Sequence, residues 1–133
     1  MHVLHKNNID LSKIHDVAII GHGNVAIDCA RILAKTTDEL AATDISKHAL
    51  EELKGSSVSD IHMIGRRGAL QSAYTIKELR ELTKLAAAKV LISKDDFQQS
   101  CNEASLQEVE NKRPLKRLFQ LTKEIVEDTA ASV

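Results

Sequence analysis

The chain has 133 residues, 43% of them hydrophobic, which suffices for one domain with a modest core. Its formal net charge of −1 offers no overall field for nucleic acid or a membrane surface, and no apolar run approaches the roughly 20 residues of a membrane-spanning helix. The first residues form neither a signal peptide nor a transit peptide, and the histidines and cysteines have no metal-ligand spacing. We therefore expect no nucleic-acid partner, no membrane span and no metal.

The first predicted elements are a strand, a glycine turn and a helix. Residues 16–20, DVAII, are a short apolar run typical of a strand buried in a parallel sheet. Residues 24–35 follow with mixed helical spacing and predict a helix. The next stretch predicts a second helix, with Thr43 or Asp44 as its N-cap and Gly55 as its C-cap.

The later elements continue this alternation. Residues 59–64 predict a second strand, residues 74–88 an amphipathic helix and residues 89–93, KVLIS, a third strand. Residues 94–113 are polar and poorly periodic, which predicts a long loop, and a last helix is expected from about 114 to 128. The pattern predicts an α/β fold: a three-layer Rossmann-like half-domain, with a three-stranded parallel sheet flanked by helices.

A candidate dinucleotide site lies at the first glycine turn. Residues 21–26, GHGNVA, fit the pattern G-x-G-x-x-A directly after a strand and at the start of a helix. Gly21 permits the turn, Gly23 lets a pyrophosphate approach the backbone, and the small Ala26 lets helix and strand pack closely. A purely structural turn is the alternative, because glycine turns after strands are common.

The end of the second predicted strand indicates which dinucleotide would bind. An NAD site has an acidic residue there for the ribose hydroxyls, whereas this chain has Gly65-Arg66-Arg67-Gly68. Two arginines suit a 2′-phosphate, which accepts forked, charge-assisted hydrogen bonds. We therefore predict NADP(H) rather than NAD(H), the alternative being a solvated basic turn.

Three stretches in the same order carry a resemblance to a known family. VAIIGHGNVAIDCARIL, TDISKHALEELK and IGRRGALQSAYTIKELREL are similar to the NADP-binding domain of adrenodoxin reductases, the mitochondrial-type NADPH–ferredoxin reductases. The similarity covers roughly residues 9–120. It implies an enzyme that carries FAD and passes electrons from NADPH to a [2Fe–2S] ferredoxin in mitochondria, with the NADP-binding domain inserted in a larger FAD domain.

The resemblance also assigns roles to single residues. It implies that the turn residues bind the pyrophosphate, that Arg66 and Arg67 bind the 2′-phosphate, and that Glu78 contacts the nucleotide. The turn residues are Gly21, His22, Gly23, Asn24 and Val25. On spacing alone Glu78 fits another role, because Thr75 and Glu78 form a potential capping box at the start of a helix.

The chain departs from the family pattern at three positions. The family usually has Gln at the position of His22, Pro at that of Ala69 and Phe at that of Tyr74. None of these departures removes a phosphate donor, and His22 adds a possible pH dependence to binding.

The start of the last predicted helix is basic, which is unfavourable for the helix dipole. By resemblance this stretch belongs to the surface where the acidic ferredoxin docks, and the alternative is a solvated face without a partner. The basic residues are Lys112, Arg113, Lys116 and Arg117.

A second fingerprint, for FAD, is absent from the sequence. We therefore expect residues 1–133 to be part of an NADP-binding domain, a reductase fragment that is inactive alone, with FAD held only by the full-length enzyme. The open edge of the half-sheet predicts a possible dimer. The alternative function is a free-standing NADP(H)-binding regulatory or interaction module. A small flavin-free reductase is less favoured, because Tyr74 is followed four residues later by Glu78 and not by a lysine.

Overall fold

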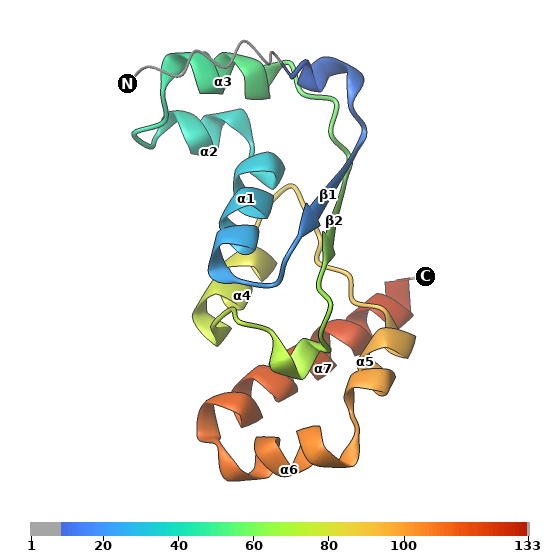
Figure 1. The fold of residues 1–133 in the computed structure, drawn as a ribbon. Helices are drawn as coiled ribbons and strands as arrows, with labels where there is room; N and C mark the ends of the chain where they lie inside the picture. Colours follow the sequence, from blue (N-terminus) through green and yellow to red (C-terminus); the bar gives the residue numbers. More distant parts are fainter. Residues whose placement is uncertain (1–8, 133) are drawn as a thin grey trace, which may run out of the picture.

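The computed structural model describes residues 9–132, in which two short parallel strands are accompanied by a series of helices (Figure 1). The strands are β1 (Asp16–Ile20) and β2 (Asp60–Ile64). The α-helices are α1 (Asn24–Ala34), α2 (Thr37–Ala41), α3 (Lys47–Lys54), α4 (Ile76–Thr83), α5 (Lys94–Ser100), α6 (Glu103–Asn111) and α7 (Arg113–Ser132), and the 3-10 turns are η1 (Leu11–Lys13) and η2 (Ala69–Gln71).

β1 and β2 pair in parallel, which confirms the predicted strand–helix–strand arrangement. Val17 lies opposite Ile61 and Ile19 opposite Met63. These side chains share one face of the sheet, and α1 and α4 cover that face with Ile27 and Leu82. The pairing continues one residue further, because the N–H of Gly21 donates to the carbonyl of Ile64 at 2.8 Å. The sheet therefore ends in two adjacent turns at its carboxyl edge.

The opposite face of the sheet is exposed, so the prediction of three layers and of fully buried strands is wrong for residues 9–132. Burial alternates along both strands, and the outward-facing Ile20 and Ile64 are 80% and 51% exposed. The physical reason is that the helices of the described chain that contact the sheet pack against its other face. The α/β class is as predicted, but the strands are covered on one side only.

The predicted third strand is also wrong, since residues 89–93 do not join the sheet. Val90 and Ile92 point inward and pack against α7. The N–H of Ile92 donates to the hydroxyl of Thr129 on α7 at 3.1 Å. A side chain thus supplies the hydrogen bond that a neighbouring strand would have given, and the described sheet has two strands.

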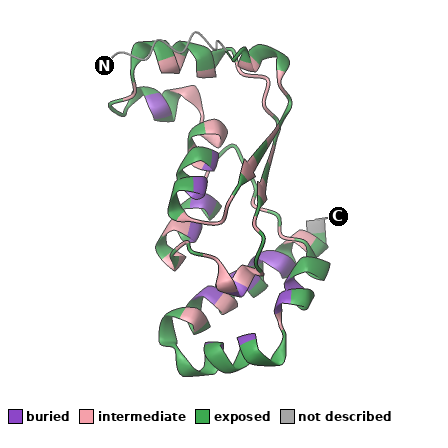
Figure 2. Cartoon of the chain, viewed as in Figure 1, coloured by how far each residue is buried: buried purple, intermediate pink, exposed green. Residues whose placement is uncertain are grey.

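Two groups of buried side chains hold the helices and strands together. The first joins α1 to the sheet through Ile27, and the second joins α4 to α7 through Leu79 and Leu118. Tyr74 and Val90 touch both groups. Figure 2 shows the buried residues along the side of α1 that faces the strands and along α7. The segment before α4 is therefore packed from both sides.

Capping residues explain where the helices between the strands begin. α3 starts after Ser46, whose hydroxyl accepts from the N–H of Ala49, so Thr43 or Asp44 as its cap was a wrong prediction. Gly55 is its C-cap, as predicted. The unexpected helix α2 begins at a capping box in which Thr36 and Glu39 bond to each other's backbone N–H.

The long loop predicted for residues 94–113 consists largely of two helices. Ser93 caps α5 and Asn102 caps α6, each by accepting a backbone N–H. Each helix has few apolar residues and buries few side chains, such as Phe97 and Val109, which is why no periodicity is visible in the sequence. The last helix, α7, begins at Arg113 with Pro114 in its first turn, close to the predicted start, and continues beyond the predicted end.

No helix among residues 9–132 combines the length and the apolar character that crossing a membrane requires.

Candidate functional site

The turn after β1 leaves open space in front of the N-terminus of α1. Gly21 has a φ of +132°, a conformation that side chains rarely allow. Gly23 is the N-cap of α1 and makes no side-chain capping bond, so the first N–H groups of α1 have no capping acceptor. A Cβ at either glycine would meet nothing within 4 Å. Open space in front of a helix N-terminus is a favourable place for an anion, which makes this turn the candidate site.

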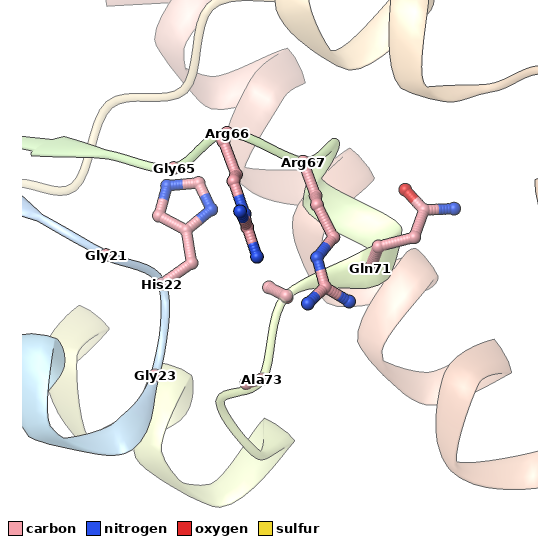
Figure 3. A pocket seen from close by; sticks show the side chains of 9 residues that line it. Gly21, His22, Gly23, Gly65, Arg66, Arg67, Gln71 and Ala73 are labelled. Carbon is pink, nitrogen blue, oxygen red and sulfur yellow. The ribbon is translucent and has the colours of Figure 1, made fainter.

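A shallow cavity of about 170 Å³ joins this turn to the turn after β2 (Figure 3). Five residues predicted for the site line it: Gly21, His22, Gly23, Arg66 and Arg67. Its other lining residues are Gly65, Gln71, Ser72 and Ala73. Sequence reasoning missed the wall at residues 71–73, because no motif marks it and only the fold brings it to the glycine turn.

Arg66 and Arg67 are available to a ligand. Both are exposed, and neither makes a hydrogen bond or an ion pair with any residue between 9 and 132. In Figure 3 both side chains extend from the turn after β2 along the cavity that Gly23 and Ala73 line. Two guanidinium groups without an anionic protein partner are suited to a phosphate group.

The backbone of His22 holds the glycine turn against the cavity wall. Its carbonyl accepts the N–H groups of Ala73 and Tyr74, at 2.9 and 3.1 Å. Its imidazole lies over Gly65, where any Cβ would collide with the ring. The Nδ1 atom of that ring is buried and has no hydrogen-bond partner among the described residues. The main chain of His22 is thus fixed while its side chain is left unsatisfied.

Asn24 and Val25 do not line the cavity. The side-chain oxygen of Asn24 accepts the N–H of Thr75 at 3.1 Å, so the first residue of α1 binds the N-cap of α4. Val25 is 76% exposed beside the turn. Asn24 therefore positions the cavity wall, and Val25 lies exposed in the first turn of α1.

Glu78 does not form the predicted capping box. The hydroxyl of Thr75 caps α4 by accepting the N–H of Glu78, as predicted, but the N–H of Thr75 itself is bonded to Asn24. The carboxylate of Glu78 instead accepts from Arg31 of α1, at 3.1 Å. Both side chains are less than one-third exposed. Glu78 therefore connects α1 to α4 and lies outside the cavity lining.

Tyr74 lies beside His22, with ring centroids 6.1 Å apart. Burial raises the pKa of its phenol, and a hydrogen bond with Ser72 lowers that pKa by less. Tyr74 is therefore a neutral neighbour of the cavity at physiological pH.

The four predicted docking residues lie together at the exposed start of α7, namely Lys112, Arg113, Lys116 and Arg117. They are remote in sequence from the cavity, and none of them lines it. The described part of the chain contains no group of three side chains arranged to hold a metal ion.

The chain is similar in sequence to several curated proteins. It is 44% identical over 112 residues to the mitochondrial NADPH:adrenodoxin oxidoreductase of Arabidopsis thaliana, a match that covers 84% of this chain and 23% of that protein. It is 46% identical over 103 residues to the human mitochondrial NADPH:adrenodoxin oxidoreductase, covering 77% of this chain and 20% of that protein. No model of a protein family matches the chain.

A solved structure supports the same relationship. The Mycobacterium tuberculosis oxidoreductase FprA, in complex with NADPH, superposes with a TM-score of 0.78 and 37% sequence identity. The superposition covers 87% of this chain and 25% of FprA. The chain thus spans about a quarter or less of the length of the curated and solved proteins that it matches.

Proposed function

Because this chain is a relative of one segment of the NADPH:adrenodoxin oxidoreductases and FprA, we propose that it is the NADP(H)-binding segment of an FAD-dependent NADPH–ferredoxin reductase. One structural observation supports the proposal independently of the similarity to these proteins. The glycine turn at the start of α1 and two arginines without an anionic partner line the same cavity. In this proposal residues 1–133 are part of an NADP-binding domain.

The turn from Gly21 to Val25 would hold the pyrophosphate, through the N–H groups at the start of α1. Arg66 and Arg67 would hold the 2′-phosphate at the tip of β2. The cavity therefore selects NADPH over NADH by charge, because NADH lacks the group that the two arginines would bind.

Glu78 is proposed as a further nucleotide contact. It forms an ion pair with Arg31, so this contact requires that the ion pair opens when the nucleotide binds. The carboxylate has to exchange the guanidinium for a ribose hydroxyl of the bound nucleotide. A Glu78→Gln variant that binds NADPH as tightly as the unaltered chain would remove this contact from the proposal.

The flavin and the ferredoxin belong to the full-length enzyme in this proposal. When bound there, FAD would accept a hydride from NADPH and pass single electrons to a [2Fe–2S] ferredoxin. The residues of this chain contribute by holding NADPH in place. The mitochondrial relatives support a mitochondrial location, which fractionation of cells expressing the tagged protein would test.

The basic start of α7 is the proposed docking surface for the acidic ferredoxin. Its exposed cations would raise the association rate and make binding sensitive to salt. Charge reversal at Arg113 and Arg117 in a full-length reductase should weaken ferredoxin binding and leave NADPH binding unchanged. A salt dependence equal to that of the unaltered enzyme would exclude this docking role.

Among residues 9–132 the strands β1 and β2 pair only with each other, and their outer edges support a dimer of the chain through strand pairing. Analytical ultracentrifugation over a range of concentrations would test it, and a monomer at every concentration would rule it out.

The nucleotide proposal is tested by calorimetric titration of the chain with NADPH and NADH. The Arg66→Ala/Arg67→Ala variant should lose roughly 100-fold in NADPH affinity, since two charge-assisted contacts disappear, while NADH affinity changes by less than about threefold. Arg80→Ala is the matched control, because Arg80 is exposed on α4 and does not line the cavity. Equal losses for both nucleotides would refute the 2′-phosphate assignment.

A chimeric enzyme separates the reductase from the alternative, a free-standing NADP(H)-binding module. A segment of a reductase should support ferredoxin reduction when it stands within a complete flavoenzyme, in place of the matching segment of a relative. Tight NADPH binding with no reduction in that chimera would favour the module.

A further inference from the structure

His22 is half-buried, and its Nδ1 is the one buried side-chain nitrogen or oxygen without a hydrogen-bond partner among the described residues. Its Nδ1 is shielded from solvent and has no hydrogen-bond partner among residues 9–132. A buried polar atom without a hydrogen-bond partner destabilises the folded state. The backbone of His22 cannot retreat to relieve this cost, because its carbonyl already accepts from Ala73 and Tyr74. Because Nδ1 is shielded and lies over Gly65, a ligand in the cavity would contact the ring only where His22 lines the cavity.

The surroundings of the ring are suited to a phosphate. The imidazole lies between Gly65 and the side chain of Arg66, on the same cavity as Arg67 (Figure 3). The close approach is possible because residue 65 has no Cβ, which would otherwise collide with the ring. The fold thus places an imidazole and two guanidinium groups around one cavity.

The charged and titratable groups that face the ring come from two segments. Arg66 and Arg67 belong to the turn after β2, and Tyr74 belongs to the segment before α4. The neighbouring residue of α1, Asn24, carries no charge. The cavity lining includes no carboxylate, so a negative charge near the ring has to come from a ligand.

We propose that His22 is a third, titratable phosphate-binding group, which makes NADP(H) binding tighten as pH falls through the range where imidazole gains a proton. This inference rests on the proposed function of the cavity and adds a form of regulation to it. Imidazole changes charge near neutral pH. A phosphate beside it favours the protonated form, so binding takes up a proton from solvent at the ring.

The bound nucleotide titrates as well, and this has to be separated from the effect of His22. The second pKa of a phosphate monoester is about 6, so at low pH the 2′-phosphate loses charge and binds the arginines less tightly. That effect opposes the one at His22. A His22→Gln variant keeps a polar side chain without a titrating ring and shares the phosphate effect. The difference between the two proteins therefore reports His22.

The experiment is calorimetric titration of the full chain and of its His22→Gln variant with NADPH, in buffers of different ionisation enthalpy near pH 7. The unaltered chain should take up a larger fraction of a proton for each NADPH bound, approaching about one proton at most. Between about pH 6 and about pH 8, its dissociation constant should change at least roughly threefold more than that of the variant. His22→Asn serves as a second variant if the glutamine disturbs folding, which circular dichroism would reveal.

NADH serves to locate the phosphate. A proton-uptake difference seen with NADPH alone supports a contact with the 2′-phosphate, and one seen with both nucleotides supports a contact with the pyrophosphate. Equal proton uptake and equal pH dependence in the chain and in both variants would overturn the role of His22. If the arginine variant still loses NADPH affinity in that case, the proposed function stands without it. If the chain binds no NADPH, both proposals fall.

Discussion

Gly65→Ala is the substitution whose effect the structure defines most sharply. A Cβ at this position would lie 2.6 Å from Cε1 of His22, and closer to two other atoms of the ring, while ordinary contact begins at 3.4 Å. The ring therefore has to move by roughly 1 Å. The backbone is not the obstacle, since Gly21 is the only described residue with a positive φ.

The movement should affect both stability and binding. Gly65 and Tyr74 bound the ring on two sides, so it would turn toward the cavity, whose volume is about 170 Å³. We expect a loss of about 1–2 kcal/mol in the free energy of unfolding, typical of a crowded substitution that a side chain relieves. NADPH affinity should fall about tenfold, because the displaced ring and the nucleotide compete for space.

Urea unfolding and calorimetric titration measure these effects, and a double variant tests their cause. In a His22→Ala background the added methyl group meets no ring, so Gly65→Ala should cost less than about 0.5 kcal/mol. Gly55→Ala is the matched control, because its Cβ would meet only a carbonyl at 3.9 Å and should be neutral or stabilising. An equal cost of Gly65→Ala with and without His22 would refute the clash.

Two further predictions concern the segment that supports the cavity. A double-mutant cycle on Arg31 and Glu78, measured by urea unfolding, should give a coupling energy of about 1 kcal/mol. The more exposed pair Lys84–Glu81 is the control and should give roughly 0.3 kcal/mol. Equal coupling energies would show that the partial burial of the first pair has no effect. Tyr74, the only tyrosine, should ionise above its ordinary pKa of 10.0 in an ultraviolet titration of the folded chain. Because the pKa of Tyr74 is higher in the folded than in the unfolded chain, the neutral phenol stabilises the fold fully below pH 10. This contribution to the free energy of unfolding is lost as pH rises through the folded-state pKa. The Tyr74→Phe variant should not show that loss. An ionisation midpoint that is the same in the folded and urea-unfolded chain would contradict it.

Local signals in the sequence were sufficient for the parts of the site that form within a few residues. The strand before Gly21, the turn itself and the start of α1 follow from a short apolar run, two glycines and a helical pattern. The tip of β2 with Arg66 and Arg67 follows in the same way. Both halves of the cavity were therefore predictable, and so was their meeting at one sheet edge, because parallel strands end on the same side.

Features that depend on distant partners were not predictable from the sequence. Residues 89–93 look like a strand because Val90 and Ile92 alternate with outward-facing residues, yet α7 and not the sheet receives them. α5 and α6 look like a loop because their sequences, KDDFQQS and EASLQEVEN, hold too few apolar residues to show a helical spacing. In both regions tertiary contacts decided the outcome, since an extended apolar segment packs as well on a helix as beside a strand.

The sequence by itself determined the glycine turn and the neighbouring arginine turn of the candidate site, because both form within a few residues. Only the tertiary structure decided how Glu78 and His22 are used. Glu78 pairs with Arg31 across 47 positions of sequence, and the ring of His22 lies over Gly65 in the turn after β2. Such pairings arise from the packing of α1 and α4 on one face of the sheet, which no local pattern encodes.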